Sequence, residues 1–132
     1  MGDLPPDMRD AHEFILELNS EIETMLKPGI ECQKLYSHAQ NRAENGPYAA
    51  NFMGTGDNHV RFIGHGIGLE LDELPVLSAK DDSKLETGMT IAIEPKIFFP
   101  ERGGVGLENT YLITETGFEK FTPYREDIIH VG

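Results

Sequence analysis

The stretch MTIAIEPKIFFPERGGVGLENTYLIT, residues 89–114, decides the fold class. Apolar and polar side chains alternate over residues 89–99 and again over 105–114, the period of two that is typical of β-strands. PERGG, at 100–104, separates the two runs and predicts a hairpin loop. This part of the chain is therefore expected to be a pair of antiparallel strands.

That pairing brings two glutamates together. A three-residue loop at 100–102 puts Phe99 opposite Gly103 and Glu94 opposite Glu108, with both carboxylates on one face of the sheet. Like charges directly opposite each other destabilise a sheet, so the pair requires bulk water or a cation. An ordinary solvated sheet face satisfies the same pattern, and a shift of one residue would separate the two side chains.

The residues before the strands predict two helices. Apolar residues recur every three or four positions over 8–26, after the helix-starting sequence PPD at 5–7 and before the helix-ending KPG at 27–29. A second helix is expected from about Glu31 to Ala43, where ENGP follows.

Short strands are expected at 59–63 and 118–122. The resulting order, two N-terminal helices packed on an antiparallel sheet, defines an α+β fold. No linker divides the sequence, which predicts a single domain over residues 1–132.

The composition restricts the partners. The 132 residues carry 11 basic and 23 acidic side chains, a formal charge of −12, which disfavours nucleic acid and anionic membrane surfaces. No apolar run reaches the ~20 residues that span a bilayer, and the N-terminus lacks the pattern of a signal peptide. The single cysteine, Cys32, excludes an intrachain disulfide. Together these features predict a cytoplasmic chain.

His65 stands between glycines in the sequence FIGHGIGLELDELP, residues 62–75. Glycine allows a positive φ and also the close approach of another backbone. The glycines beside His65 are therefore consistent with a flexible turn and also with a histidine that must reach a ligand. A histidine on a turn after a short strand can lie near Glu94 and Glu108. One imidazole and two carboxylates suit manganese, iron, cobalt or zinc. A lone histidine is also often structural, so both interpretations stay open.

Three stretches stand in order along the chain: FIGHGIGLELDELP (62–75), LETGMTIAIEP (85–95) and GGVGLENTYLITETG (103–117), preceded by MLKPGIECQKLY (25–36). They resemble successive motifs of the pita-bread metallopeptidases, the family that includes methionine aminopeptidase, creatinase and the Xaa-Pro peptidases. The order and spacing of the stretches also match, over roughly residues 8–122. The leucine-glutamate-leucine form of the first stretch is most similar to a bacterial Xaa-Pro branch.

The resemblance implies a pita-bread fold and a metal-dependent hydrolase that cleaves peptide bonds next to proline. It implies two divalent ions (manganese, cobalt or zinc) in the full-length enzyme, with a bridging hydroxide that attacks the peptide carbonyl. His65, Glu94 and Glu108 correspond to three of the five protein ligands. Glu94 also corresponds to the residue that helps to move the proton, and Glu108 to the carboxylate that bridges both metals.

The sequence departs from the family pattern at three places. The other two ligands are aspartates eleven residues apart, and no two aspartates here have that spacing. Asp72 takes the position of a histidine that contacts the substrate in many members. We assign it a catalytic and substrate-binding role, with the capping of a turn as an equal alternative. Gly106 stands where some prolidase-like members have arginine.

The missing aspartates lead us to expect the carboxyl-terminal portion of a longer catalytic domain. Such a chain would be inactive alone, would bind at most one metal ion weakly, and would associate with itself or with the missing N-terminal half. The alternative is a non-catalytic pita-bread module that binds a peptide or protein, against which the retention of His65, Glu94 and Glu108 argues.

Overall fold

The structure, a computed structural model, describes residues 3–131. In that range the helices are α1 (Pro6–Met25) and α2 (Cys32–Glu44), and the strands are β1 (Phe62–Gly66), β2 (Glu73–Ser78), β3 (Thr90–Ile93), β4 (Lys96–Phe99), β5 (Gly103–Gly106), β6 (Asn109–Thr114) and β7 (Gly117–Lys120).

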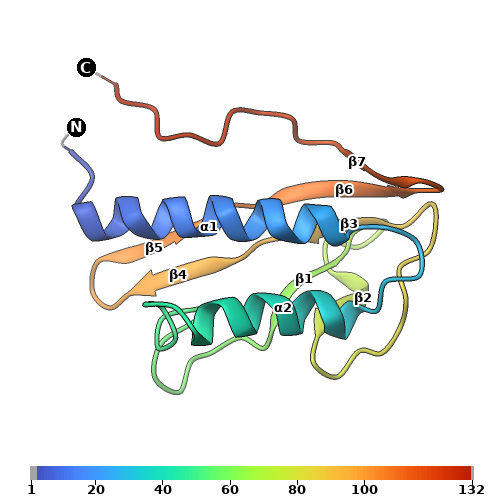
Figure 1. Cartoon of the computed structure of the whole chain (residues 1–132), viewed down its shortest axis with the longest axis horizontal. Helices are drawn as coiled ribbons and strands as arrows, with labels where there is room; N and C mark the ends of the chain where they lie inside the picture. The colour runs from blue at the N-terminus through green and yellow to red at the C-terminus, as the bar shows by residue number, and fades with distance from the viewer. Residues whose placement is uncertain (1–2, 132) are drawn as a thin grey trace.

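Five of these strands form an antiparallel sheet in the order β2-β1-β3-β6-β7, and β4 and β5 form a two-stranded ribbon. Helix α1 packs on β4 and β5, and α2 packs on β1 and β2, so the apolar core lies between the helices and the strands (Figure 1). The predicted α+β fold, with two N-terminal helices packed on an antiparallel sheet, is confirmed.

Helix α1 forms where the apolar stripe predicts it. Pro6 suits the first turn, where its missing N–H needs no partner, and Asp7 interacts favourably with the positive end of the helix dipole. The helix ends at Met25 because Leu26 is extended, with φ −68° and ψ 112°, and Pro28 follows. Its buried face comprises Ala11, Phe14, Ile15, Leu18, Asn19 and Ile22.

Helix α2 runs within one residue of its predicted bounds and is tied to α1 by polar contacts. Glu21 on α1 accepts hydrogen bonds from Arg42 Nε at 2.9 and 3.0 Å and lies 2.7 Å from His38 Nε2. Burial acts to raise the pKa of Glu21, but the hydrogen bonds from Arg42 and His38 outweigh it, and the net pKa is lowered. The carboxylate is therefore the form that joins the two helices.

The predicted register of the hairpin is confirmed. Phe99 lies opposite Gly103 in the β4–β5 ribbon, and Ile93 lies opposite Asn109 in the β3–β6 pair. The residues between these pairs keep the same register, because the Leu107 nitrogen lies 3.4 Å from the Pro95 carbonyl oxygen and donates to it.

The predicted continuity of these strands is wrong. The strand expected over 89–99 divides into β3 and β4, and the one expected over 105–114 divides into β5 and β6. The ladder breaks at residues 94–95 and 107–108, where Pro95 has no N–H to donate.

The other strands show two further differences. The strand expected at 59–63 is β1, which begins three residues later, and β2 was not predicted. Pro75 within β2 argues against a strand when the sequence is considered alone, but β2 is an edge strand, where proline is tolerated. The strand expected at 118–122 is β7, Gly117–Lys120.

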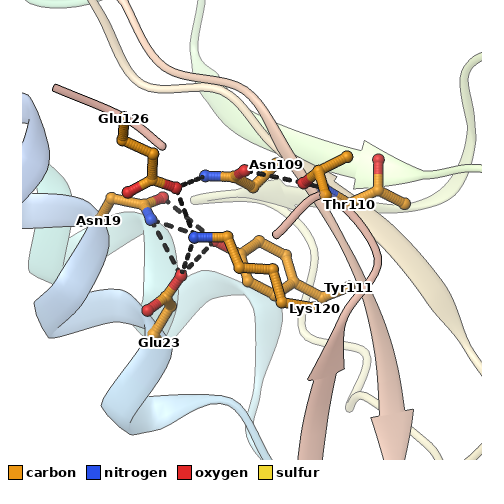
Figure 2. A network of polar contacts seen from close by, with 8 residues as sticks. Asn19, Glu23, Asn109, Thr110, Tyr111, Lys120 and Glu126 are labelled. Atoms are coloured by element: carbon orange, nitrogen blue, oxygen red, sulfur yellow. Dashed lines mark hydrogen bonds and ion pairs between the residues drawn. The ribbon is translucent and has the colours of Figure 1, made fainter. Parts of the chain in front are cut away.

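A buried polar network joins α1 to the sheet, as Figure 2 shows. The Tyr111 hydroxyl donates to Glu23 Oε1 at 2.8 Å and accepts from Asn19 Nδ2 at 3.1 Å. Burial raises the pKa of Tyr111 far above its usual value; the hydrogen bond from Asn19 opposes this rise, and Glu23 adds to it. The hydroxyl thus stays a hydrogen-bond donor, and Tyr111 is 0% exposed.

The network continues into the C-terminal segment after β7. Lys120 Nζ lies 3.0 Å from Glu23 Oε1 and also contacts Glu126, and Glu126 accepts a hydrogen bond from Asn109 Nδ2 at 2.8 Å (Figure 2). Thr122 donates to Asn109 Oδ1 at 2.7 Å. These contacts hold the segment along α1, where Figure 1 shows it running back past the helix.

None of the helices formed by residues 3–131 has the length and apolar composition needed to cross a bilayer.

Replacing Tyr111 with Phe should lower the free energy of unfolding by about 1–3 kcal/mol, because Asn19 and Glu23 each lose a buried partner. Urea denaturation followed by circular dichroism measures this change. Tyr124→Phe is the matched control: its ring is 81% exposed, so a change within about 0.5 kcal/mol is expected. Equal effects of the two substitutions would contradict a stabilising role for the Tyr111 hydroxyl.

Candidate metal and substrate site

His65 lies within strand β1 and not on the turn that the sequence suggested. It pairs with Ala92 of β3 on one side and with Val76 of β2 on the other. Strand pairing on both sides therefore fixes the backbone at the histidine. His65 is only 7% exposed.

The glycines beside His65 allow neighbouring strands to approach closely. A methyl group at Gly64 would lie 2.2 Å from the Ala92 carbonyl oxygen, and one at Gly66 would lie 2.4 Å from the Leu74 carbonyl oxygen. Neither glycine has the positive φ of a left-handed turn. Of the two properties of glycine that the sequence left open, close backbone approach is the one used here.

The His65 ring is oriented by its own strand and faces two carboxylates. Nδ1 lies 2.9 Å from the Gly66 carbonyl oxygen, which can only accept, so Nδ1 carries a proton. Nε2 lies 2.9 Å from Asp72 Oδ1 and 3.3 Å from Glu94 Oε1. Nε2 is consequently the nitrogen available to a proton or a cation shared with these oxygens.

Glu94 and Glu108 occupy the break between the two strand pairs. The register on both sides of the break places them across from each other. The Glu94 side chain is 14% exposed and lies against His65, whereas Glu108 is exposed and borders a groove of about 340 Å³ with Val105 and Leu107. The structure thus joins His65 to Glu94, and no polar contact of Glu108 with either occurs among residues 3–131.

Lys96 is a neighbour of the site that sequence reasoning did not identify. Its ammonium group contacts the Glu94 carboxylate. Glu94 lies in the break between β3 and β4, so the periodicity of a strand does not indicate this contact.

The donor set has the right chemistry for a divalent cation, but it is not gathered into a cluster. The site offers an imidazole whose tautomer is fixed through Nδ1, and carboxylates next to it. This combination of ligands suits manganese, cobalt or zinc. Over residues 3–131, however, no three His, Cys, Asp or Glu side chains are grouped closely enough to hold a metal ion. The residues present fit such an ion by type, with His65 and Glu94 already adjacent.

Asp72 is the last residue of the bend that precedes β2, and its side chain reaches the histidine. Its side chain is 74% exposed, and Oδ1 contacts His65 Nε2. The turn is instead bridged by Glu73, whose Oε2 accepts a hydrogen bond from the Glu70 N–H at 3.2 Å. Asp72 therefore presents an open carboxylate beside a buried imidazole.

Comparison with known proteins identifies the class. Residues 1–115 match the metallopeptidase family M24, and the chain belongs to this family. The sequence is 36% identical over 121 residues to an Xaa-Pro dipeptidase of Pyrococcus furiosus, which covers 92% of this chain and 33% of that protein. An Xaa-Pro dipeptidase of Pyrococcus horikoshii is 37% identical over 92% of this chain and 32% of its own.

Solved structures give the same result for the fold. The X-Pro aminopeptidase of Thermotoga maritima superposes with a TM-score of 0.88 at 27% identity, covering 99% of this chain and 35% of that one. The prolidase of Pyrococcus horikoshii gives a TM-score of 0.86 at 36% identity, covering 98% and 35%. The chain thus spans about a third of the length of these relatives. The resemblance to pita-bread metallopeptidases is confirmed.

Gly64→Ala should displace β1 from β3, because the new methyl group meets the backbone of Ala92. We expect a loss of at least about 2 kcal/mol of stability, the scale of overpacking in a tight interior. Gly68→Ala is the matched control from the same motif, since its methyl group meets only the mobile end of the Glu73 side chain. Thermal unfolding of both variants measures the difference, and a Gly64→Ala variant as stable as Gly68→Ala would show that close approach is not the constraint.

Proposed function

We propose that this chain supplies three metal ligands, His65, Glu94 and Glu108, to an Xaa-Pro peptidase that cleaves peptide bonds next to proline. The observation that carries the proposal is the contact of His65 Nε2 with Glu94 Oε1 at 3.3 Å, in a chain of the metallopeptidase family M24. The Xaa-Pro dipeptidases of two Pyrococcus species support the substrate class.

The proposed metal is manganese, cobalt or zinc, held by His65 and the two glutamates. A divalent ion, when bound, supplies Lewis-acid chemistry to peptide hydrolysis. The chain contributes the orientation: the Gly66 carbonyl fixes the His65 tautomer and leaves Nε2 facing the site. Two ions in a complete enzyme require the two aspartates that the family pattern adds, and the 132 residues lack such a pair.

The proposed catalytic residues other than the ligands act on protons and substrate. Glu94 is mostly buried and next to the imidazole, which suits a carboxylate that takes up and returns a proton. Asp72 is open to solvent and adjacent to His65, which suits contact with the substrate without direct metal binding. The same residues would constitute the C-terminal portion of a pita-bread catalytic domain.

The proposed protein partner is the remainder of a longer catalytic domain, or a second copy of the chain. The loop between β1 and β2, together with the start of β2, exposes three leucines beside Asp72: Leu69 at 102%, Leu71 at 75% and Leu74 at 80%. Large apolar side chains gathered in this way commonly mark a surface that another protein covers. The cytoplasm is the proposed location, which suits the single unpaired thiol of Cys32.

Metal binding is the first test. Calorimetric titration of the chain with zinc or manganese should show weak, saturable binding, and His65→Ala should weaken it about 10-fold or more. Binding should also weaken at acid pH, because imidazole and carboxylate must lose their protons to coordinate. Glu108→Ala should have an effect similar to that of His65→Ala, whereas Asp72→Asn should have little.

His130→Ala and Glu101→Ala are matched controls, since both residues are exposed and outside the site. A binding signal that survives His65→Ala and Glu108→Ala but falls in a control would place the metal elsewhere.

Hydrolysis is the second test. The 132 residues with manganese should not turn over a Gly-Pro dipeptide or an Xaa-Pro tripeptide. A protein in which they follow a segment with two aspartates eleven residues apart should do so. There Glu94→Gln should lower kcat by about 100-fold or more, because a proton carrier is lost, whereas Glu101→Gln should leave it unchanged.

Two results would change the proposal. Turnover by the 132 residues alone, abolished by Glu108→Ala, would show that the two aspartates are not required. Peptide binding by the longer protein without metal and without turnover would favour the non-catalytic pita-bread module.

A further inference from the structure

A second cavity lies away from the histidine and its carboxylates. It has a volume of about 550 Å³ and is formed by α2, the loop before β1, and the end of β2 with the turn that follows. His65, Asp72, Glu94 and Glu108 do not line it. The side chains used below are Tyr36, Gln40, His59, Arg61, Ser78 and Lys80.

The sheet brings the two charged residues of this cavity to the same end. Phe62 of β1 lies opposite Ser78 of β2 in the antiparallel pair. Arg61 immediately precedes Phe62, and Lys80 follows two residues after Ser78, so both cations emerge where the pair ends. The guanidinium and the ammonium group therefore border one space.

The charge of the cavity wall is positive, whereas the chain as a whole is acidic. Acidic residues outnumber basic ones 23 to 11, yet the cavity wall that residues 3–131 form contains no aspartate or glutamate. Neither Arg61 nor Lys80 forms an ion pair with the described residues, whereas six other basic residues do: Lys34, Arg42, Lys96, Arg102, Lys120 and Arg125. Two cations without an ion-pair partner at a cavity of this size favour an anion as occupant, although Glu44 lies near Tyr36 and Gln40 of the wall.

Three neutral side chains of the wall, Tyr36, Gln40 and Ser78, can donate a hydrogen bond. Burial raises the pKa of the Tyr36 hydroxyl; the nearby Arg61 opposes the rise and Glu44 adds to it, so the hydroxyl stays protonated. Ser78 Oγ accepts from the Lys80 N–H at 3.4 Å and keeps its own proton for a ligand. His59 is fixed by its Nδ1, 3.0 Å from the Phe52 carbonyl oxygen. The Gln40 amide donates one N–H to Glu44 Oε1 at 2.8 Å, which leaves its second N–H for a ligand.

We propose that this cavity binds a small anion with two or more negative charges, a phosphorylated or polycarboxylated molecule, through Arg61 and Lys80. Carboxylate and phosphate share the oxygens that accept the two-pronged hydrogen bonds of a guanidinium. The volume lies within the range of about 300–1,000 Å³ found for small-molecule sites. The proposal is independent of the metal site and of peptidase activity.

Calorimetric titration of the chain with pyrophosphate, and separately with citrate, tests it. Both titrations use low ionic strength and contain no divalent metal, so that the metal site cannot contribute. Saturable 1:1 binding of at least one probe is expected, against the repulsion of a chain with a net charge of −12. Binding of pyrophosphate alone identifies a phosphate ligand, binding of citrate alone a carboxylate ligand, and binding of both a general oxyanion site.

The variants locate the binding. Arg61→Gln and Lys80→Gln should each weaken it about 10-fold, the scale of a charge-assisted hydrogen bond. Arg61→Lys should weaken anion binding less, because lysine keeps the positive charge but lacks the two-pronged hydrogen-bond donors of a guanidinium. Lys84→Gln is the matched control: it removes the same charge from an exposed lysine four residues beyond Lys80 and outside the cavity wall, and the affinity should not change.

Amide NMR shifts in the same titrations confirm where the anion sits. Changes centred on Tyr36, Gln40, Arg61 and Ser78 support the proposal, and the spectra of the variants also show that each one is folded. Absence of saturable binding by both probes would overturn it. Equal weakening by Lys84→Gln and Lys80→Gln would also overturn it, because the effect would then come from net charge alone.

Discussion

The antiparallel pairing of residues 90–99 with residues 103–112 is the constraint on which the rest of the structure depends. One register serves both halves of this pairing, although the ladder is interrupted between them. On the helix-facing side the pairing buries Ile91 against Tyr111, and at the interruption it places Glu94 across from Glu108. The buried Ile91–Tyr111 pair and the relative position of the two glutamates are thus two consequences of one alignment, and a slip of one residue would lose both.

The site depends equally on how closely β1 can lie against β3. Gly64 has no side chain to hold the strands apart, so the strand that carries the histidine is paired with β2 on one side and with β3 on the other. Its ring then needs only the Gly66 carbonyl to set its orientation. Membership of family M24 rests on sequence similarity, and the contact between His65 and Glu94 rests on the geometry of the structure. Both are consistent with a metal site at these two residues.

Much of the fold could be predicted from local patterns, because the helices and the hairpin follow from periodicity and turn residues. The start of β1 and the existence of β2 could not be predicted in this way, because both depend on the pairing of β1 with β2. Pro75 is compatible with that pairing because β2 is an edge strand. His65, Glu94 and Glu108 were predicted as one group; the structure brings His65 and Glu94 into contact, and the grouping with Glu108 stays a prediction. The side-chain contacts of Asp72 and Lys96 with this group depend on a loop and on rotamers, which periodicity does not specify.

The two edges of the five-stranded sheet bear on the solubility of folding intermediates. Strand β2 carries Pro75, and β7 has only four residues, including Glu119 and Lys120. A proline offers no N–H to an incoming strand, and charged side chains on a short edge strand disfavour the addition of an apolar strand beside it. These features disfavour fibril-like growth of copies of this chain at the two edges of the five-stranded sheet.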